Sequence, residues 1–115
     1  MGPTLYGIPN CDSVKRARAW LAERGVEHRF HDFKTAGVPA DRLGAWLEAA
    51  GWERLLNRRG PTWRKLDAVL QAGVVDAPTA AAVVRAHASL QRPVVEWPSG
   101  AITVGFDATE FARHC

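Results

Sequence analysis

The chain has 115 residues, of which 47% are hydrophobic and 23% charged, and its net charge is +3. This length and composition suit a single globular domain over residues 1–115 and exclude a disordered chain. The small positive excess fits an anionic ligand and is too weak to indicate nucleic acid as a partner. No apolar run approaches the roughly 20 residues that span a bilayer, so we expect no membrane partner either.

Cysteine usage points to a reducing compartment. The two cysteines, Cys11 and Cys115, lie near opposite ends of the chain, and the N-terminus shows no signal peptide. A secreted domain of this size would more often carry several disulfides. We therefore expect a cytoplasmic protein with two reduced thiols and no bridge between them.

The first third of the chain has the pattern of a βαβ unit. Residues 4–8 form a short apolar strand that a Pro-Asn turn ends, and residues 26–33 form a second strand before a loop at 34–39. Between them, the stretch to about residue 24 is helical, because three apolar side chains share one helical face: Val14, Ala17 and Leu21. A helix between two strands predicts a parallel pair.

The remainder predicts helices and then a ββα unit. A helix is expected over residues 41–50, an apolar stretch then leads into a basic loop at 57–61, and a second helix is expected from Asp76 to about residue 88. Strands at 93–97 and 101–106 form an antiparallel hairpin, and Asp107 opens a last short helix. The result is a mixed four-stranded α/β sheet of the thioredoxin type, one candidate among several α/β and α+β folds.

Cys11 is the first candidate for chemistry, because it follows the first strand at the mouth of the first helix. The free N–H groups and the dipole at a helix start stabilise a thiolate. Lys15, four residues on along the same face, adds positive potential. The alternative is a buried structural cysteine. Residue 14 is Val and not Cys, so a CxxC dithiol is excluded, and a single thiol needs an external one such as glutathione to release a mixed disulfide.

Five segments, in order along nearly the whole chain, carry a family resemblance. They are residues 5–12 (LYGIPNCD), 31–34 (HDFK), 55–66 (LLNRRGPTWRKL), 92–94 (RPV) and 104–106 (VGF). Together they resemble the ArsC/Spx family of arsenate-reductase-related proteins, and most closely its YffB-type branch.

The resemblance implies a thioredoxin-like fold with a helical insertion. It further implies that Arg92–Pro93 is a cis-proline step that faces Cys11 and pairs with a bound thiol peptide. Arg59 and Arg92 are then expected to line an anion pocket beside the sulfur. Asn10, in the turn before Cys11, and Lys15 complete the expected binding set.

The function expected from this resemblance is a glutathione-dependent thiol reductase. Cys11 would form a mixed disulfide with glutathione or another small anionic or thiol substrate, in a monomer without bound cofactor or metal. One alternative is an arsenate reductase linked to glutathione and glutaredoxin. However, true arsenate reductases carry a further arginine after the last strand, where residues 105–108 here read GFDA. The other alternative is a non-catalytic Spx-like regulator that binds RNA polymerase, although such regulators usually have CxxC.

Overall fold

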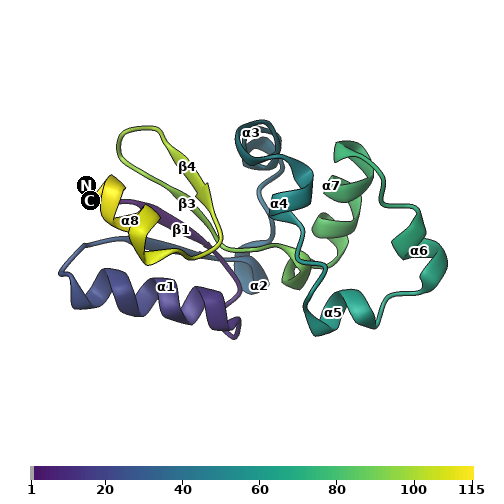
Figure 1. Ribbon diagram of the computed structural model, residues 1–115, viewed down its shortest axis with the longest axis horizontal. Helices are drawn as coiled ribbons and strands as arrows, with labels where there is room; N and C mark the ends of the chain where they lie inside the picture. The colour runs from purple at the N-terminus through teal and green to yellow at the C-terminus, as the bar shows by residue number, and fades with distance from the viewer. Residues whose placement is uncertain (1) are drawn as a thin grey trace.

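The computed structural model describes residues 2–115 (Figure 1). Its strands are β1 (Thr4–Gly7), β2 (Arg29–Asp32), β3 (Val94–Glu96) and β4 (Ile102–Val104). Its helices are α1 (Asp12–Glu23), α2 (Phe33–Ala36), α3 (Ala40–Ala50), α4 (Trp52–Leu55), α5 (Pro61–Arg64), α6 (Ala68–Ala72), α7 (Ala77–Ala86) and α8 (Ala108–His114), with a 3-10 turn η1 (Ala88–Leu90) before β3. This order confirms the βαβ start, the ββα end and the helical insertion between them.

The four strands form one mixed sheet in the order β2-β1-β3-β4. β1 pairs in parallel with β2 and antiparallel with β3, and β3 pairs antiparallel with β4. The crossover through α1 allows the parallel pair, while the short 98–100 turn can join only antiparallel strands. The predicted sheet is therefore confirmed.

One face of the sheet is covered by α1 and α8 (Figure 1). Leu5 of β1 and Val95 of β3 point to this side, where Trp97 and Phe111 pack edge to face with ring centroids 5.1 Å apart. α1 contributes a buried stripe to the same cluster: Val14, Ala17, Trp20 and Leu21. Its helical spacing is the one recognised in the sequence.

The opposite face packs against α3, α4 and α7 of the insertion. Alternation along the strands sends Tyr6 and Val94 to this side, where they meet the fully buried Trp46 of α3. α5 and α6 extend beyond the sheet, which gives the molecule extents of 44 × 26 × 25 Å (Figure 1). Within residues 2–115, none of the helices combines the length and the apolar character needed to cross a membrane.

Two segments differ from the sequence prediction. Residues 34–39 were expected to be a loop, but Phe33–Ala36 forms one helical turn, because the Asp32 carboxylate caps it by accepting from the Lys34 N–H at 2.8 Å. The stretch after Gly51 contains three short helices that were not predicted: α4 and α5, on either side of the basic loop, and α6. Of these segments, α5 supplies Pro61 and Thr62 to the site described below.

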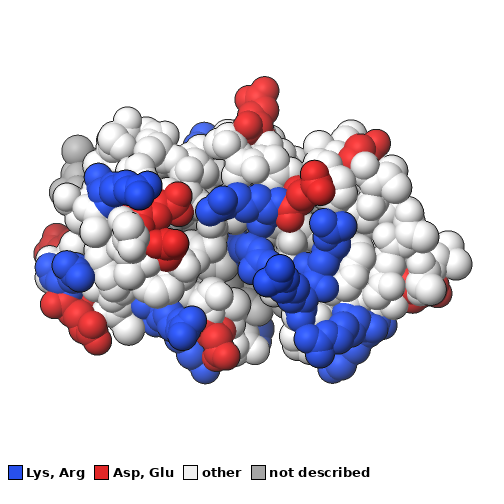
Figure 2. All heavy atoms as spheres, in the orientation of Figure 1, with Lys and Arg blue, Asp and Glu red and all other residues white. Residues whose placement is uncertain are grey.

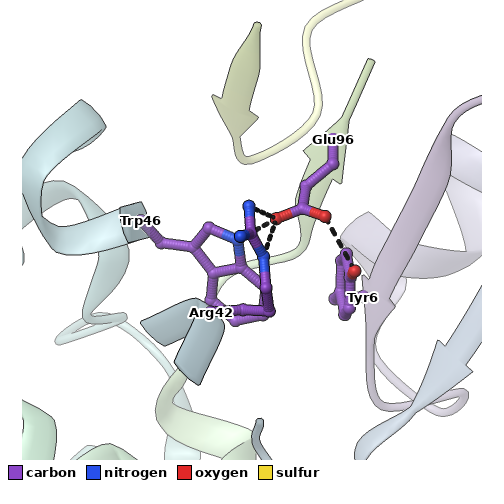
Figure 3. Close-up of polar contacts among 4 residues, drawn as sticks. All are labelled: Tyr6, Arg42, Trp46 and Glu96. Atoms are coloured by element: carbon purple, nitrogen blue, oxygen red, sulfur yellow. Dashed lines mark hydrogen bonds and ion pairs between the residues drawn. The ribbon is translucent and has the colours of Figure 1, made fainter. Parts of the chain in front are cut away.

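A polar cluster fastens α3 to the sheet (Figure 3). The Glu96 carboxylate of β3 accepts from the Tyr6 hydroxyl at 2.8 Å, from Arg42 Nε at 2.7 Å and from Trp46 Nε1 at 2.9 Å. Burial of Glu96 opposes its ionisation, but these three hydrogen bonds and the Arg42 charge outweigh burial and lower the pKa of Glu96. Burial and the same carboxylate raise the pKa of Tyr6 to about 12. The tyrosine therefore remains a neutral donor across the physiological range.

Candidate active site

Cys11 is the N-cap residue of α1, as predicted. Its backbone is extended (φ −88°, ψ 132°), its N–H donates to the Ile8 carbonyl at 3.3 Å, and its carbonyl accepts from the Lys15 N–H at 2.9 Å. No side chain caps the helix, so the thiol makes no hydrogen bond to the first-turn N–H groups. Because such groups have no partner inside their helix, they are available to a thiolate or to a bound anion.

The position of Cys11 depends on a close approach between β1 and α1. A Cβ placed on Gly7 would lie 2.5 Å from Val14 Cγ2, well inside van der Waals contact. Only glycine therefore lets the end of β1 pass so near the first turn of α1. Since Cys11 lies in the short connection between these residues, their packing holds the thiol in place.

The thiol borders an open cleft of about 400 Å³. One wall is the β1–α1 connection, with Ile8, Asn10, Cys11, Asp12 and Ser13. The other wall consists of Asn57, Gly60, Pro61 and Thr62 around the start of α5, together with Ser89 of η1. The cleft thus lies between the first helix and the insertion, and it is lined mainly by small polar side chains.

Backbone and side-chain bonds hold the far wall. The Asn57 N–H donates to the Leu90 carbonyl at 2.6 Å, and the Asn57 side chain accepts from the Arg59 N–H at 3.1 Å. The hydroxyls of Thr62 and Ser89 lie 2.8 Å apart and link α5 to η1. Each hydroxyl has one proton, so the bond between them uses one and leaves the other for a ligand.

The sequence reasoning did not assign five of these polar lining residues to the site: Asp12, Ser13, Asn57, Thr62 and Ser89. Single small polar residues in turns are common, and nothing in their spacing singles them out. Asn57 and Thr62 lie within the 55–66 segment that carried part of the family resemblance. Ser89 carried no signal, because only the fold of the insertion brings η1 beside α5.

Two of the six predicted site residues, Asn10 and Cys11, line the cleft. Arg59 is exposed and lies between two lining residues, and its carbonyl accepts from Arg64 Nη2 at 2.7 Å. Arg92 is half-buried at the entry to β3, where its N–H donates to the Leu55 carbonyl at 2.9 Å. Lys15 is exposed one turn into α1. These three cations are not among the residues that line the cleft.

The two arginines of the basic loop differ in their surroundings. Arg58 lies over the Trp52 ring at 5.6 Å and has an ion pair with Glu53 at 3.8 Å, so α4 engages its charge. Arg59 has no ion-pair partner among residues 2–115. Its guanidinium is therefore the one of the pair that is available to a ligand.

The prediction of a cis peptide bond between Arg92 and Pro93 is wrong. No peptide bond within residues 2–115 is cis, so this bond has the ordinary trans form. The backbone bonds on both sides are made in the trans form: Arg92 donates to Leu55, and the Pro93 carbonyl accepts from the Gly105 N–H at 2.8 Å. The trans isomer is also the intrinsically favoured one, by about 0.5–1 kcal/mol. Pro93 itself is buried at the start of β3.

The predicted absence of an internal disulfide is confirmed, since Cys11 and Cys115 are both free thiols. Cys115 is exposed and borders a pocket with Pro3, before the first residue of β1, whereas Cys11 follows the other end of that strand. Four strand residues separate the two ends by about 13 Å at roughly 3.3 Å each. No second thiol is therefore within reach of Cys11.

Comparisons with known proteins agree on the kind of molecule this is. The model of the ArsC family matches residues 6–114. A YffB protein of known structure has a TM-score of 0.89 and 38% identity, with 97% of each chain covered. An arsenate-reductase-related protein from Brucella melitensis has a TM-score of 0.74 and 41% identity, covering 99% of this chain and 94% of its own.

Other relatives differ in their described roles. An uncharacterized protein of Haemophilus influenzae is 37% identical over 109 residues, which is 94% of each chain. The global transcriptional regulator Spx of Streptococcus pyogenes is 26% identical over 113 residues, covering 93% of this chain and 80% of its own. The arsenate reductase from Vibrio cholerae shares only the fold, with 16% identity and a TM-score of 0.75. With a thioredoxin-like fold and a family match over nearly its whole length, this chain belongs to the ArsC family.

Proposed function

We propose that the protein is a glutathione-dependent thiol-disulfide reductase with Cys11 as its only nucleophile. The observation that carries this proposal is a thiol at the uncapped start of α1, beside a cleft of about 400 Å³, with no second cysteine in reach. Membership in a family that contains arsenate-reductase-related proteins supports thiol-based reduction.

The reaction has two exchange steps. The Cys11 thiolate attacks one sulfur of a substrate disulfide, the S–S bond breaks, and the other sulfur leaves as a thiolate that takes up a proton. A glutathione thiolate then attacks the sulfur that is bonded to Cys11, the mixed disulfide breaks, and Cys11 leaves as a thiolate. When the group left on Cys11 is glutathionyl, this second step forms oxidised glutathione, and glutathione is the reductant throughout.

The cations around the cleft would orient the anionic tripeptide. Arg59 and Arg92 are proposed to bind its carboxylates, since charge-assisted bonds of guanidinium to carboxylate are strong and directional. Lys15 adds positive potential, and Asn10 in the lining offers amide donors. Pro93 shapes the backbone at the entry to β3. The glutathione supply required by this reaction is that of the cytoplasm, where we propose the protein acts.

Mass spectrometry after incubation with oxidised glutathione tests the proposal directly. We expect one glutathionyl group on Cys11, and free glutathione should remove it again. The Cys115→Ser variant should behave like the parent, whereas Cys11→Ser should gain no adduct. A protein that takes the adduct only on Cys115 would contradict the proposal.

Arsenate reduction is a weaker candidate for this chain. Residues 105–108 contain no arginine, and the Gly105 N–H is already bonded to Pro93. A compact oxyanion depends on every clamp around it, and each charge-assisted hydrogen bond contributes on the order of 1.5–3 kcal/mol. We therefore expect weak or absent arsenate reduction when arsenate and a small disulfide are assayed side by side with glutathione and glutaredoxin. Ready turnover of arsenate alone would reverse this assignment.

The likeness to Spx favours a second class of function, a regulator that binds RNA polymerase without catalysis. Turnover separates the two classes. A reductase reduces a small disulfide with glutathione, and the reaction depends on Cys11. In a regulator of this kind, a reagent would still alkylate Cys11, but no disulfide would be turned over.

A further inference from the structure

Basic side chains gather on one face of the molecule, from its middle across α5 (Figure 2). Three exposed cations of this region lie on or beside α5: Arg59, Arg64 and Lys65. Among residues 2–115 the ion pairs are Arg42–Glu96, Arg54–Glu110 and Arg58–Glu53, so none of the three is neutralised. This trio is called the α5 basic surface below.

An apolar groove lies between α6 and α7. Its volume is about 590 Å³, and its apolar lining comes from α6, α7 and the turn between them: Val69, Leu70, Val74, Ala82, Val83 and Ala86. Val69 is 81% exposed and Leu70 43% exposed, although each is large enough to be expected in a core. Exposed apolar side chains that gather in one groove, as these do, are typical of a contact surface.

α5 contacts both the reactive cleft and α6, the helix whose side chains line part of the groove. Pro61 and Thr62 of α5 line the cleft of Cys11, while the next residue, Trp63, accepts a hydrogen bond from Gln71 of α6 at 2.6 Å. α5 thus links the wall of the thiol cleft to the helix that borders the groove. A chain that crosses α5 meets the cations between these two sites.

The carboxylates nearest the groove do not neutralise the α5 basic surface. Asp67 accepts from the Val69 N–H at 2.7 Å and caps α6, while Asp76 accepts from the Thr79 N–H at 3.0 Å and caps α7. Their negative charges face helix N-termini, which carry positive partial charge. Arg64 Nη2 donates to the Arg59 carbonyl at 2.7 Å, but among residues 2–115 no carboxylate forms an ion pair with Arg59, Arg64 or Lys65.

We propose that this surface docks acidic protein segments, so that the substrate class of Cys11 is a disulfide carried by an acidic, partly apolar polypeptide. This inference rests on the proposed reductase function and names its substrate. Acidic side chains of the segment meet the α5 basic surface, an apolar side chain enters the α6–α7 groove, and the disulfide reaches the cleft. A nucleic acid would use the cations alone and leave the groove empty.

Two synthetic peptides of equal length provide the probe. Each carries two leucines and one cysteine in mixed disulfide with glutathione, flanked by glutamates in one peptide and by lysines in the other. With free glutathione as reductant, the protein should release the acidic peptide's thiol at least about tenfold faster at low salt. The ratio should fall as salt rises, because screening weakens charge pairing.

A matched pair of double variants separates local from overall charge. Arg64→Glu with Lys65→Glu should abolish the preference for the acidic peptide. Arg29→Glu with Arg113→Glu changes the net charge equally at exposed sites on β2 and α8, away from α5, and should retain it. Both double variants should reduce hydroxyethyl disulfide, which is small and uncharged, at the parent rate.

A third variant tests the groove. Val69→Ser with Leu70→Ser should slow the reaction of both peptides severalfold without changing the rate with hydroxyethyl disulfide. Equal rates for acidic and basic peptides in the parent protein would overturn the docking proposal while leaving the reductase intact. So would competition by a short DNA duplex without any peptide preference. No reaction of Cys11 with any of the disulfides would instead remove the reductase function itself.

Discussion

Two helices of similar length begin in opposite ways. α7 starts with a capping box, in which the Asp76 side chain accepts from the Thr79 N–H at 3.0 Å and the Thr79 hydroxyl accepts from the Asp76 N–H at 3.1 Å. α1 starts at Cys11 and has no side-chain cap at all. The first start satisfies its own donors, and the second leaves them to whatever occupies the cleft. The side-chain cap therefore stabilises the start of α7, whereas the uncapped start of α1 leaves its first N–H groups available to a thiolate or a bound anion.

Loss of the Cys11 thiol should change the activity most. Cys11→Ser should abolish glutathione-dependent disulfide reduction, because a hydroxyl cannot form the mixed disulfide. Cys115→Ser should leave the rate unchanged, and a coupled assay of oxidised glutathione measures both. If Cys11→Ser retained activity, Cys11 would not be the nucleophile, and the uncapped start of α1 would have no catalytic role.

A substitution where β1 passes α1 should displace the start of α1 and so affect Cys11. Gly7→Ala places a methyl group 2.5 Å from Val14 Cγ2, so the first turn must move. Overpacking of this kind costs about 1–3 kcal/mol of unfolding free energy. We expect a lower midpoint in denaturant together with slower alkylation of Cys11.

Gly44→Ala is the control for this change, since no atom lies within contact distance of the added methyl group in α3. It should leave Cys11 reactivity unchanged. Equal alkylation rates in the two variants would show that the packing of β1 on α1 does not hold the thiol.

The cations should act on binding rather than on the thiol. Arg59→Ala or Arg92→Ala should raise the glutathione concentration needed for half-maximal rate roughly tenfold, which corresponds to about 1.4 kcal/mol. Arg58→Ala is the matched control, because Glu53 and Trp52 already engage that guanidinium. An equal effect of Arg58→Ala would assign the binding to the net charge of the loop.

The uncapped start of α1 should have a measurable stability cost. Serine is a preferred N-cap residue, so Cys11→Ser should raise the free energy of unfolding by up to about 1 kcal/mol. The same variant is thus expected to be inactive and more stable. Urea denaturation of the parent and the variant measures the change, and a destabilised variant would show that packing of the thiol outweighs the cap.

The capped start of α7 should respond to acid. The hydrogen bonds from Thr79, side chain first and backbone second, lower the pKa of Asp76 below its ordinary value of 3.8. Its contribution to stability is therefore present above that value and is lost as the pH falls through the lowered pKa. Asp76→Ala should lower Tm at neutral pH, and the difference from the parent should narrow in acid, with activity unchanged throughout.

Local sequence signals were enough to predict the order of the four strands, the helices α1, α3, α7 and α8, and the place of Cys11. Local signals suffice for these: apolar residues at helical spacing in α1, the Asp-Ala-Pro start of α7, and a Pro-Asn turn that ends β1. The family resemblance further predicted the helical insertion and pointed to Arg59 and Arg92 as candidate binding residues. Residues 34–39 show the limit, because a one-turn helix has too few residues to produce a periodic pattern.

Which distant residues come together could not be predicted from the sequence, because it depends on long-range packing. Tyr6 and Glu96 are 90 positions apart, and Thr62 and Ser89 are 27 apart, yet each pair forms a hydrogen bond. The first pair depends on the pairing of β1 with β3, and the second on how α5 packs against η1 within the insertion. Packing of this kind is the sum of many small apolar contacts with no local signature. The same packing engages Arg58 with α4 and leaves Arg59 without a partner, although the two are neighbours in the sequence. Periodicity records which face of a helix is buried, and it carries no information about what lies opposite that face.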